Sequence, residues 1–412
     1  MDIIKQKNMV KVLRVEKHNI SKEHKMWKIC DEYCFKSKNL YNYANYIIRQ
    51  RFINNKGIPT HIDLSKEIKH DQQFINLGSN SSQQIIKLLC KNWKSFISLV
   101  KKYDNNPLSL LGRPKMPKYK KKDGRYICIF TNMQTQIKDG YLFFAFKPFK
   151  PYNNLIKTNI KGKHMQTRII PKGGCYTLEI VYEVEIQEYK DPNNRIVGID
   201  LGADNLATCV NNVGSKSIII NGRPLKSINQ FYNKEKAQMQ SNLKKLHNKD
   251  WSNKLQKLQN KRDNKIDYYL HCASKSIVNY CEGLNIDTVI IGLNKTWKQK
   301  SGMTKIRNQN FISIPYYKFI SQLEYKLQNK GIKLIVNEES YTSGCSFLDN
   351  EPINKTYYNK DRRITRGLFK SNNGTIINAD SNGAYNIIKK VIPGAFVNGI
   401  EGVDLHPLRV SV

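Results

Sequence analysis

The sequence has few acidic residues for its length. It contains 33 Asp and Glu against 69 Lys and Arg, which gives a formal net charge of +36 over 412 residues. A surplus of this size is self-repelling in a compact chain, so it favours a polyanionic partner such as nucleic acid. A Lys- and Asn-rich composition explains the preference for Lys over Arg, but it does not explain the shortage of acids.

Long apolar runs and paired cysteines are also missing. No run approaches the ~20 apolar residues of a membrane span, and residues 1–20 lack the apolar core of a secretory signal. The nine cysteines are scattered, and no two of them form a CxxC pair. This pattern favours reduced thiols over a disulfide framework. We therefore expect a bacterial cytoplasmic protein that acts at the nucleoid and has no membrane partner; the oligomeric state stays open.

The N-terminal half changes its periodicity twice. Residues 1–20 and 108–190 are typical of short strands and turns, whereas the apolar spacing of residues 21–107 is helical. The pattern predicts a β-barrel interrupted early by a helical insertion. Residues 191–194, which read Asp-Pro-Asn-Asn, are expected to form a linker to the second half.

A basic run, Lys115–Lys122, follows a loop rich in Pro and Gly. Such a run is usually a solvated face, but here it joins two elements of an already basic protein. We predict that several of its side chains contact nucleic acid, namely Lys115, Lys118, Lys120 and Lys121.

The second half has the pattern of a mixed α/β sheet. Apolar strands are expected at residues 196–202, 205–210, 218–220, 288–291 and 333–336, and helices at about 227–283 and 316–329. Three strands come first, and helices then alternate with the remaining strands. This order predicts a sheet with both parallel and antiparallel pairs.

Two acids in this half occupy positions that suit metal ligands. Asp200 ends a buried strand beside Gly202, where a phosphate can approach closely, although Asp also ends many strands as a turn residue. Asp380 opens a helix whose small residues would allow close packing on a sheet, although an N-cap is its ordinary role. Two-metal hydrolysis of a phosphodiester needs several such acids around ions ~3.5–4 Å apart.

In their order along the chain, four segments resemble the split RuvC nuclease of TnpB proteins. These proteins come from insertion-sequence elements and are relatives of type V CRISPR effectors. The segments are Gly198-Ile199-Asp200-Leu201-Gly202, Leu206-Ala207-Thr208, Tyr341-Thr342-Ser343 and Asn378-Ala379-Asp380 with Asn382-Gly383-Ala384. The resemblance covers residues 195–412 well, and the N-terminal half only in its organisation.

The resemblance implies an α/β RNase H-like (RuvC) nuclease domain over residues 195–412, with a helical insertion at about 227–283. It implies a wedge β-barrel from residues 1–20 and 108–190, with a helical recognition domain at residues 21–107. The implied activity is RNA-guided cleavage of double-stranded DNA next to a short target-adjacent motif. The guide RNA would come from the transposon end, and the cofactor would be two Mg²⁺ ions, for which Mn²⁺ can substitute.

The sequence departs from the common TnpB pattern at the second catalytic acid. That acid is a Glu at the end of the strand that here reads Thr288–Asn294, and Gly292 stands in its place. The next strand ends in Glu338-Glu339 and lies beside it in an RNase H-like sheet. We therefore expect Asp200, Glu339 and Asp380 as catalytic metal ligands, with Glu338 as the alternative to Glu339. The ordinary interpretation is that both glutamates are solvated strand-end acids.

A second departure concerns zinc. The common pattern has two CxxC pairs between the Tyr-Thr-Ser segment and the last Asp, whereas here only Cys345 is present. One thiol cannot make a four-ligand structural site, so no zinc is predicted. The loop at about 343–377 is expected to bind target nucleic acid through phosphate contacts from Arg362, Arg363, Arg366 and Lys370. A TnpB branch is similar in combining these departures with Asn294 and Trp297-Lys298-Gln299.

Three alternatives stay open. The first is a nuclease-dead, RNA-guided repressor, although Asp200 and Asp380 would have no reason to persist in it. The second is a DNA transposase of the strand-joining type, which uses a similar sheet and similar metals. The third is a plain RNA-binding module in which the acids are structural. The residues that would read a target-adjacent motif are not identifiable in the sequence.

Overall fold

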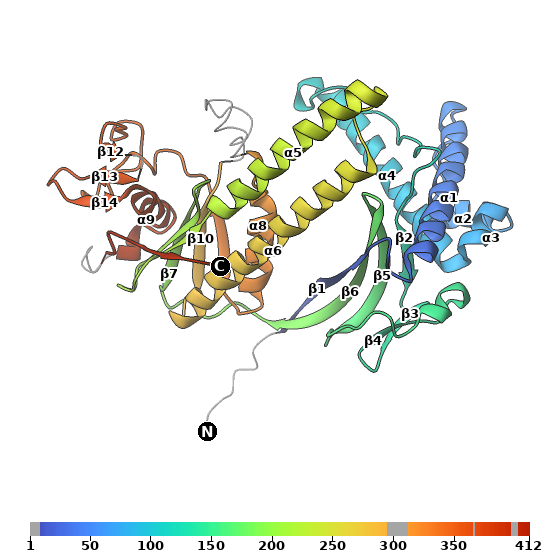
Figure 1. Cartoon of the computed structure of the whole chain (residues 1–412), viewed down its shortest axis with the longest axis horizontal. Helices are drawn as coiled ribbons and strands as arrows, with labels where there is room; N and C mark the ends of the chain where they lie inside the picture. Colours follow the sequence, from blue (N-terminus) through green and yellow to red (C-terminus); the bar gives the residue numbers. More distant parts are fainter. Residues whose placement is uncertain (1–8, 295–311, 366, 397–402) are drawn as a thin grey trace. The chain divides into compact units, whose positions relative to one another are not determined.

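The computed structural model describes residues 9–294, 312–365, 367–396 and 403–412, and the chain divides into two compact units (Figure 1). The N-terminal unit is Lys11–Glu185, and the C-terminal unit contains Ile186–Val412. Residues 191–194, expected as a linker, lie in the C-terminal unit, where the Asn193 amide donates to Asp287 Oδ2 at 2.6 Å. Of the helices in these ranges, none combines the length and apolar character required to cross a membrane.

The N-terminal unit contains a four-stranded sheet and a separate hairpin. The sheet order is β1-β6-β5-β2, with β1 at Met9–Ile20, β6 at Cys175–Gln187, β5 at Lys163–Lys172 and β2 at Cys128–Thr131. The hairpin pairs β3 (Thr135–Lys138) with β4 (Tyr141–Phe144). Among the described strands, the expected closed barrel does not form. The helices α1 and α4 pack on β5 and β2, so the apolar face of the sheet is buried without closure.

The helices of this unit fall in the range expected to be helical. They are α1 at Trp27–Ile53, α2 at His61–Ile68, α3 at Gln72–Leu77 and α4 at Ser79–Asn105. Asn45 on α1 is fully buried and accepts a hydrogen bond from Trp93 Nε1 on α4 at 2.9 Å. Its own Nδ2 donates to the carbonyl of Pro117 at 3.1 Å. One amide therefore joins two helices and the basic segment.

The C-terminal unit is built on a six-stranded sheet. Its order is β11-β10-β7-β8-β9-β15, with β7 at Ile196–Leu201, β8 at Asn205–Asn211, β9 at Ile218–Asn221, β10 at Thr288–Gly292, β11 at Lys333–Asn337 and β15 at Leu408–Val410. The first three strands are antiparallel, and β10 and β11 run parallel to β7. This order and these directions are those of an RNase H-like sheet, as expected, with β15 added at the β9 edge.

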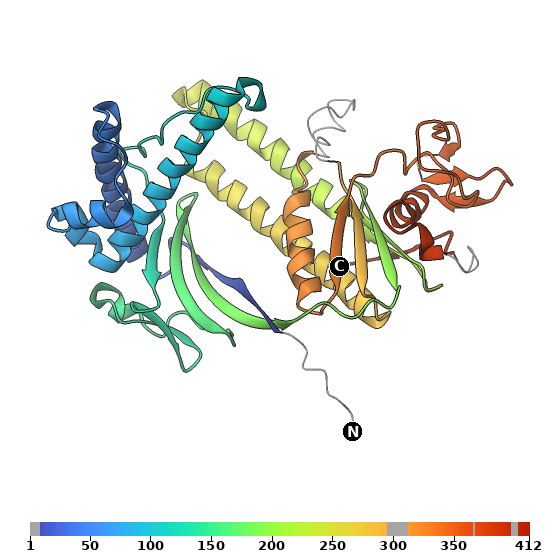
Figure 2. The ribbon, with the colours of Figure 1, turned by 180° about the vertical axis from the view of Figure 1, so that it is seen from behind.

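Helices cover both faces of this sheet (Figures 1 and 2). They are α5 at Arg223–His247, α6 at Asn253–Gly283, α8 at Tyr316–Gln328 and α9 at Ala379–Val391. Val197 and Ile199 of β7 pack in one core with α6 and α8, whereas Ile196 packs in another with α9. Because strand side chains alternate between faces, Asp200 points to the same side as Ile196, towards α9.

A small three-stranded sheet lies in the loop before α9. It consists of β12 at Arg363–Thr365, β13 at Leu368–Lys370 and β14 at Ile376–Asn378, in antiparallel pairs. Phe369 of β13 and Ile377 of β14 are buried against α9. This loop therefore has a core of its own that is continuous with the α9 face of the large sheet.

We predict that Asn45→Ala lowers the free energy of unfolding by about 2 kcal/mol or more, because it leaves the buried Trp93 Nε1 and the Pro117 carbonyl without a shared partner. Denaturant titration followed by tryptophan fluorescence measures the change. The matched control is Gln50→Ala, an exposed position on the same helix, which should shift the midpoint little. Equal shifts for the two variants would contradict the role given to Asn45.

Candidate functional site

Three acids from three elements meet on the α9 side of the large sheet. Asp200 is the fifth residue of β7, Asp380 lies in the first turn of α9, and Glu339 follows the end of β11. Helix α9 comes close to Asp200 because position 383 is glycine: a Cβ there would lie 3.1 Å from Asp200 Oδ2. The structure therefore brings together the three acids that the sequence and its resemblance predicted.

The mutual repulsion of these acids appears in the pKa of Asp200. Burial raises this pKa most, and the negative charges of Asp380 and Glu339 raise it further, while Arg363 opposes them. The pKa of Glu339 is raised from 4.5 to about 7, first by burial and then by the charge of Glu338. Negative charge is thus concentrated where little solvent is available to screen it.

Glu338 and Glu339 point to different surroundings. Glu338 Oε2 lies 2.8 Å from Lys390 Nζ, and Oε1 accepts from the amide of Ser340 at 2.9 Å. Although burial alone would raise it, these hydrogen bonds lower the pKa of Glu338. Glu339 instead turns towards Asn294, whose Oδ1 accepts from the Glu339 amide at 3.3 Å. Of the two glutamates, Glu339 lies with Asp200 and Glu338 is paired with a lysine.

Gly292 provides the space that Glu339 occupies. A Cβ at position 292 would lie 2.7 Å from Glu339 Oε2 and 3.0 Å from its Cβ, and 2.5 Å from Ile387 Cδ1. The 2.7 Å distance is too short for real atoms, so a side chain at 292 requires the Glu339 carboxylate to leave its present position. The missing acid at the end of β10 and the extra acid after β11 are two parts of one steric arrangement.

The ordinary N-cap role considered for Asp380 belongs to Asn378. Asn378 Oδ1 accepts from the amides of Asp380 and Ser381, both at 3.0 Å. The Asp380 carboxylate faces other groups: Oδ2 accepts from Asn205 Nδ2 at 2.6 Å, and Oδ1 lies 3.9 Å from Arg363 Nη2. Sequence reasoning assigned no role to Asn205 or Asn378, because an amide near a strand start or a helix start carries no specific signal.

The donor set at this site is made of carboxylate oxygens, the ligands that Mg²⁺ prefers. Burial raises the pKa of Asp200 most and the charges of Asp380 and Glu339 raise it further, and a divalent cation would oppose both effects. In the described ranges, no three His, Cys, Asp or Glu side chains are arranged to hold a metal ion as they stand. Asp380 is engaged by Asn205 and lies near Arg363, so ion binding would require these contacts to loosen.

The loop at 343–377 is tied to α9 by buried amides. Asn382 Nδ2 and Asn386 Nδ2 each donate to the Cys345 carbonyl at 2.8 Å. Asn382 Oδ1 accepts from the amide of Phe347 at 2.9 Å, and the Phe347 ring stacks on Tyr385 with centroids 4.7 Å apart. The beginning of the loop is therefore fixed by hydrogen bonds and ring packing to the helix that carries Asp380.

The basic residues expected to contact phosphates differ in their surroundings. Arg362 Nη1 lies 2.7 Å from Glu351 Oε1 and 3.6 Å from Asp349 Oδ2, so its guanidinium is engaged in holding the loop. Arg363 is exposed beside Asp380, and Lys370 is exposed on β13. Arg366 lies outside the described residues, as do Trp297, Lys298 and Gln299 of the resembling branch.

The lysines of the basic run also differ. Lys120 Nζ lies 4.8 Å from the ring centroid of Tyr41 and 4.6 Å from that of Tyr126, and burial lowers its pKa. It therefore lies against a pair of rings that pack on each other, with centroids 4.7 Å apart. The remaining predicted contacts are exposed, namely Lys115, Lys118 and Lys121.

We predict opposite pH effects for the two glutamates in a buffer with EDTA. Because the pKa of Glu339 is raised on folding, the native state holds a proton that the unfolded state loses, and stability falls as pH rises from 4.5 to about 7. Glu339→Gln should therefore be more stable than wild type at pH 8, with the difference shrinking at pH 4.5.

The control is Glu338→Gln. The pKa of Glu338 is lowered on folding, so its charged form stabilises the native state above its unfolded pKa. This variant should be less stable than wild type at pH 8. Unfolding midpoints at the two pH values measure both effects, and equal signs for the two variants would contradict the surroundings described for them.

Two stretches of the chain match models of known protein families. Residues 179–298 match a family model described as "Probable transposase", and residues 316–387 match a model described as "Cas12f1-like, TNB domain". Two solved structures show a low similarity. One is a Cas12f1–sgRNA–target DNA complex, which is 18% identical, with 91% of this chain and 98% of that chain covered and a TM-score of 0.37. The other is a CRISPR-Cas12f ternary complex, which is 16% identical, with 87% of this chain and 80% of that chain covered and a TM-score of 0.39.

Two curated relatives share more sequence. The CRISPR-associated endodeoxyribonuclease Cas12f2 of Micrarchaeota archaeon (strain CG1_02_47_40) is 29% identical over 62% of this chain and 47% of the relative. The TnpB-like protein ORF457 of Acidianus two-tailed virus is 27% identical over 52% of this chain and 46% of the relative. The chain thus spans about half the length of the curated relatives it matches. The chain is therefore similar to proteins described as probable transposases, Cas12f nucleases and TnpB-like proteins.

Proposed function

We propose that this chain is an RNA-guided DNA endonuclease of transposon origin, and that Asp200, Glu339 and Asp380 form its hydrolytic site. The observation that supports this proposal is the convergence of the three acids on one side of an RNase H-like sheet, where burial raises the pKa of Asp200 most and the other two acids raise it further. Structural acids on a soluble surface are usually paired with cations or solvated. Glu338 is such an acid, whereas none of the ion pairs among the described residues involves Glu339.

The three acids would hold two Mg²⁺ ions, for which Mn²⁺ can substitute. When bound, such ions supply the charge that activates water and stabilises the leaving oxygen. The chain positions the acids around them: β7 carries Asp200 and α9 carries Asp380, while Asn205 orients the Asp380 carboxylate. Arg363 is exposed at 3.9 Å from Asp380 Oδ1, where its guanidinium would meet the phosphate of a bound strand.

The partners we propose are a guide RNA from the transposon end and a double-stranded DNA target beside a short target-adjacent motif. A relative is named an endodeoxyribonuclease, and a similar solved structure is described as a complex with sgRNA and target DNA. The net charge of +36 supports polyanionic partners. Guide pairing would supply sequence specificity, while the protein would recognise duplex shape. Binding should weaken steeply as salt is raised.

Two other functions share this fold. A nuclease-dead, RNA-guided repressor is suggested by Gly292 at the place of the usual acid, but Glu339 fills the space that this glycine leaves. A transposase that joins strands is suggested by the description of the matched family model. The products separate these readings, because hydrolysis leaves free ends, strand transfer leaves joined DNA, and a repressor leaves the target intact.

We predict that Asp200→Ala, Asp380→Ala and Glu339→Ala each slow cleavage of a guide-matched duplex by about 100-fold or more, because each removes a ligand from the ions. Guide and target binding should remain within about threefold of wild type, because the acids lie outside the phosphate contacts. Cleavage assays with Mg²⁺ and gel-shift titrations measure the two quantities. Glu338→Ala is the matched control and should cut nearly as fast as wild type. Cleavage by the Glu339 variant at the wild-type rate would show that Glu339 is not a required metal ligand.

A fourth substitution tests how Glu339 is positioned. Gly292→Ala adds a single methyl group 2.7 Å from Glu339 Oε2 and should displace that carboxylate. We expect cleavage to fall by at least about tenfold, and the Mg²⁺ concentration needed for half-maximal rate to rise, as for loss of a supporting contact. The control is Gly283→Ala, where a Cβ would have no neighbour within 4 Å. Equal rates for both variants would show that Glu339 does not depend on the space at 292.

A further inference from the structure

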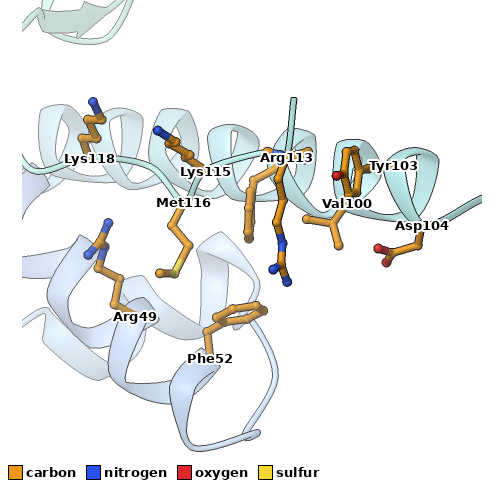
Figure 3. A pocket seen from close by; sticks show the side chains of 11 residues that line it. Arg49, Phe52, Val100, Tyr103, Asp104, Arg113, Lys115, Met116 and Lys118 are labelled. Carbon is orange, nitrogen blue, oxygen red and sulfur yellow. The ribbon is translucent and has the colours of Figure 1, made fainter. Parts of the chain in front are cut away.

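The N-terminal unit contains a cavity that includes two of the lysines predicted to contact nucleic acid, Lys115 and Lys118, and that the carboxylate site does not use. Its volume is ≈ 520 Å³, and it lies between the C-terminal halves of α1 and α4 and the segment 113–118 (Figure 3). A second hollow of ≈ 320 Å³ shares Phe96, Lys115 and Lys118 with it and continues along the same segment. Ligand sites for small organic groups commonly have volumes of about 300–1,000 Å³.

The two ends of the cavity differ in charge. Figure 3 shows Arg49 and Lys118 at one end, and Tyr103 and Asp104 at the other. Phe52, Val100 and Met116 lie between the ends, together with Arg113, and Phe96 also lines the cavity. The cavity therefore offers cations at one end, an apolar surface with a ring in the middle, and a hydrogen-bond acceptor at the other end.

The wall formed by segment 113–118 is held in place from α1. Arg49 donates from Nε and Nη2 to the Pro117 carbonyl at 3.3 and 3.0 Å, and its guanidinium carbon lies 4.8 Å from the centroid of the Tyr119 ring. Asn42 pairs with the backbone of Lys120 in both directions, at 3.0 and 2.8 Å. These contacts fix the segment before any ligand arrives, which lowers the entropic cost of binding.

We propose that this cavity binds one unstacked nucleotide of a nucleic-acid strand. The base would lie against Phe52 and Met116, as unstacked bases lie on aromatic and apolar side chains. The phosphates on either side would meet the cations of Arg113, Lys115 and Lys118. Asp104 would accept a hydrogen bond from the exocyclic amine of the base, which thymine and uracil lack. This assignment is independent of the carboxylate site and of cleavage.

The test uses the full-length protein and labelled pentanucleotides in which four positions are abasic and the central position carries one base or none. Fluorescence anisotropy measures the affinities for DNA and RNA versions. We expect a central adenine or cytosine to raise affinity roughly tenfold over the fully abasic strand, as for a base stacked on an aromatic ring. The preferred backbone, DNA or RNA, then identifies the source of the nucleotide.

Three variants separate the parts of the cavity. Phe52→Leu should remove most of the gain due to the base and leave abasic binding unchanged. Asp104→Asn should reduce the preference for adenine and cytosine over thymine or uracil. Arg113→Ala should lower the affinity for base-bearing and abasic pentanucleotides alike by about threefold, as for one lost phosphate contact. Lys69→Ala, exposed and outside the cavity lining, is the control for general loss of charge.

Because Phe52 packs on Trp93 and Phe96 with ring centroids 5.5 and 5.8 Å apart, the unfolding midpoint of its variant is measured alongside. Asp104→Asn lies on the surface and keeps the test independent of folding. Equal affinity of wild type for base-bearing and abasic strands would overturn the proposal. So would an unchanged base gain and an unchanged base preference in the Phe52 and Asp104 variants.

Discussion

The repulsion between three carboxylates is the constraint on which the C-terminal unit depends. Burial and the neighbouring charges raise the pKa of Asp200, and Glu339 titrates near neutral pH. Such a cluster lowers the stability of the folded chain, and clusters of this kind are common at functional sites. Strands β7, β10 and β11 are adjacent and parallel, so Asp200 and Glu339 lie at the same end of the sheet. The glycine at 383 lets α9 bring Asp380 beside them. The similarity to TnpB-like proteins and the geometry therefore support the same proposed set of acids.

The same edge shows how an acid can change its position without a change of fold. In β10 and β11, parallel pairing places Gly292 opposite Asn337, so an acid at position 292 and an acid shortly after Asn337 can enter the same space. Only one of them fits, because a side chain at 292 overlaps Glu339. The loop at 343–377, which lacks the paired cysteines of a zinc site, is held by other contacts. Arg362 between Glu351 and Asp349, and the amides of Asn382 and Asn386, connect it internally and to α9.

The sequence predicted the sheet well because periodicity reports burial. The strands ending at Asp200 and Gly292 are apolar on both faces, and the order of strands and helices left few possible topologies. Asp200, Glu339 and Asp380 were identifiable from strand ends and family motifs. The closed barrel was not found among the described strands, because α1 and α4 cover the sheet instead. The strand pattern in the sequence does not reveal this covering. Arg362 and Lys120 were expected to contact nucleic acid, but their ion pairs and ring contacts are long-range features that a charge pattern cannot show.

The central claim is that Glu339 replaces an acid at position 292 and that the two exclude each other. Cleavage of a guide-matched duplex by Gly292→Glu/Glu339→Gly, measured beside each single variant, tests this claim most directly. The account predicts that both single variants lose cleavage, one through overlap and one through loss of a ligand, and that the double variant regains a substantial part of it. Cleavage by Glu339→Gly alone at the wild-type rate would contradict the account, as would a double variant no better than either single one.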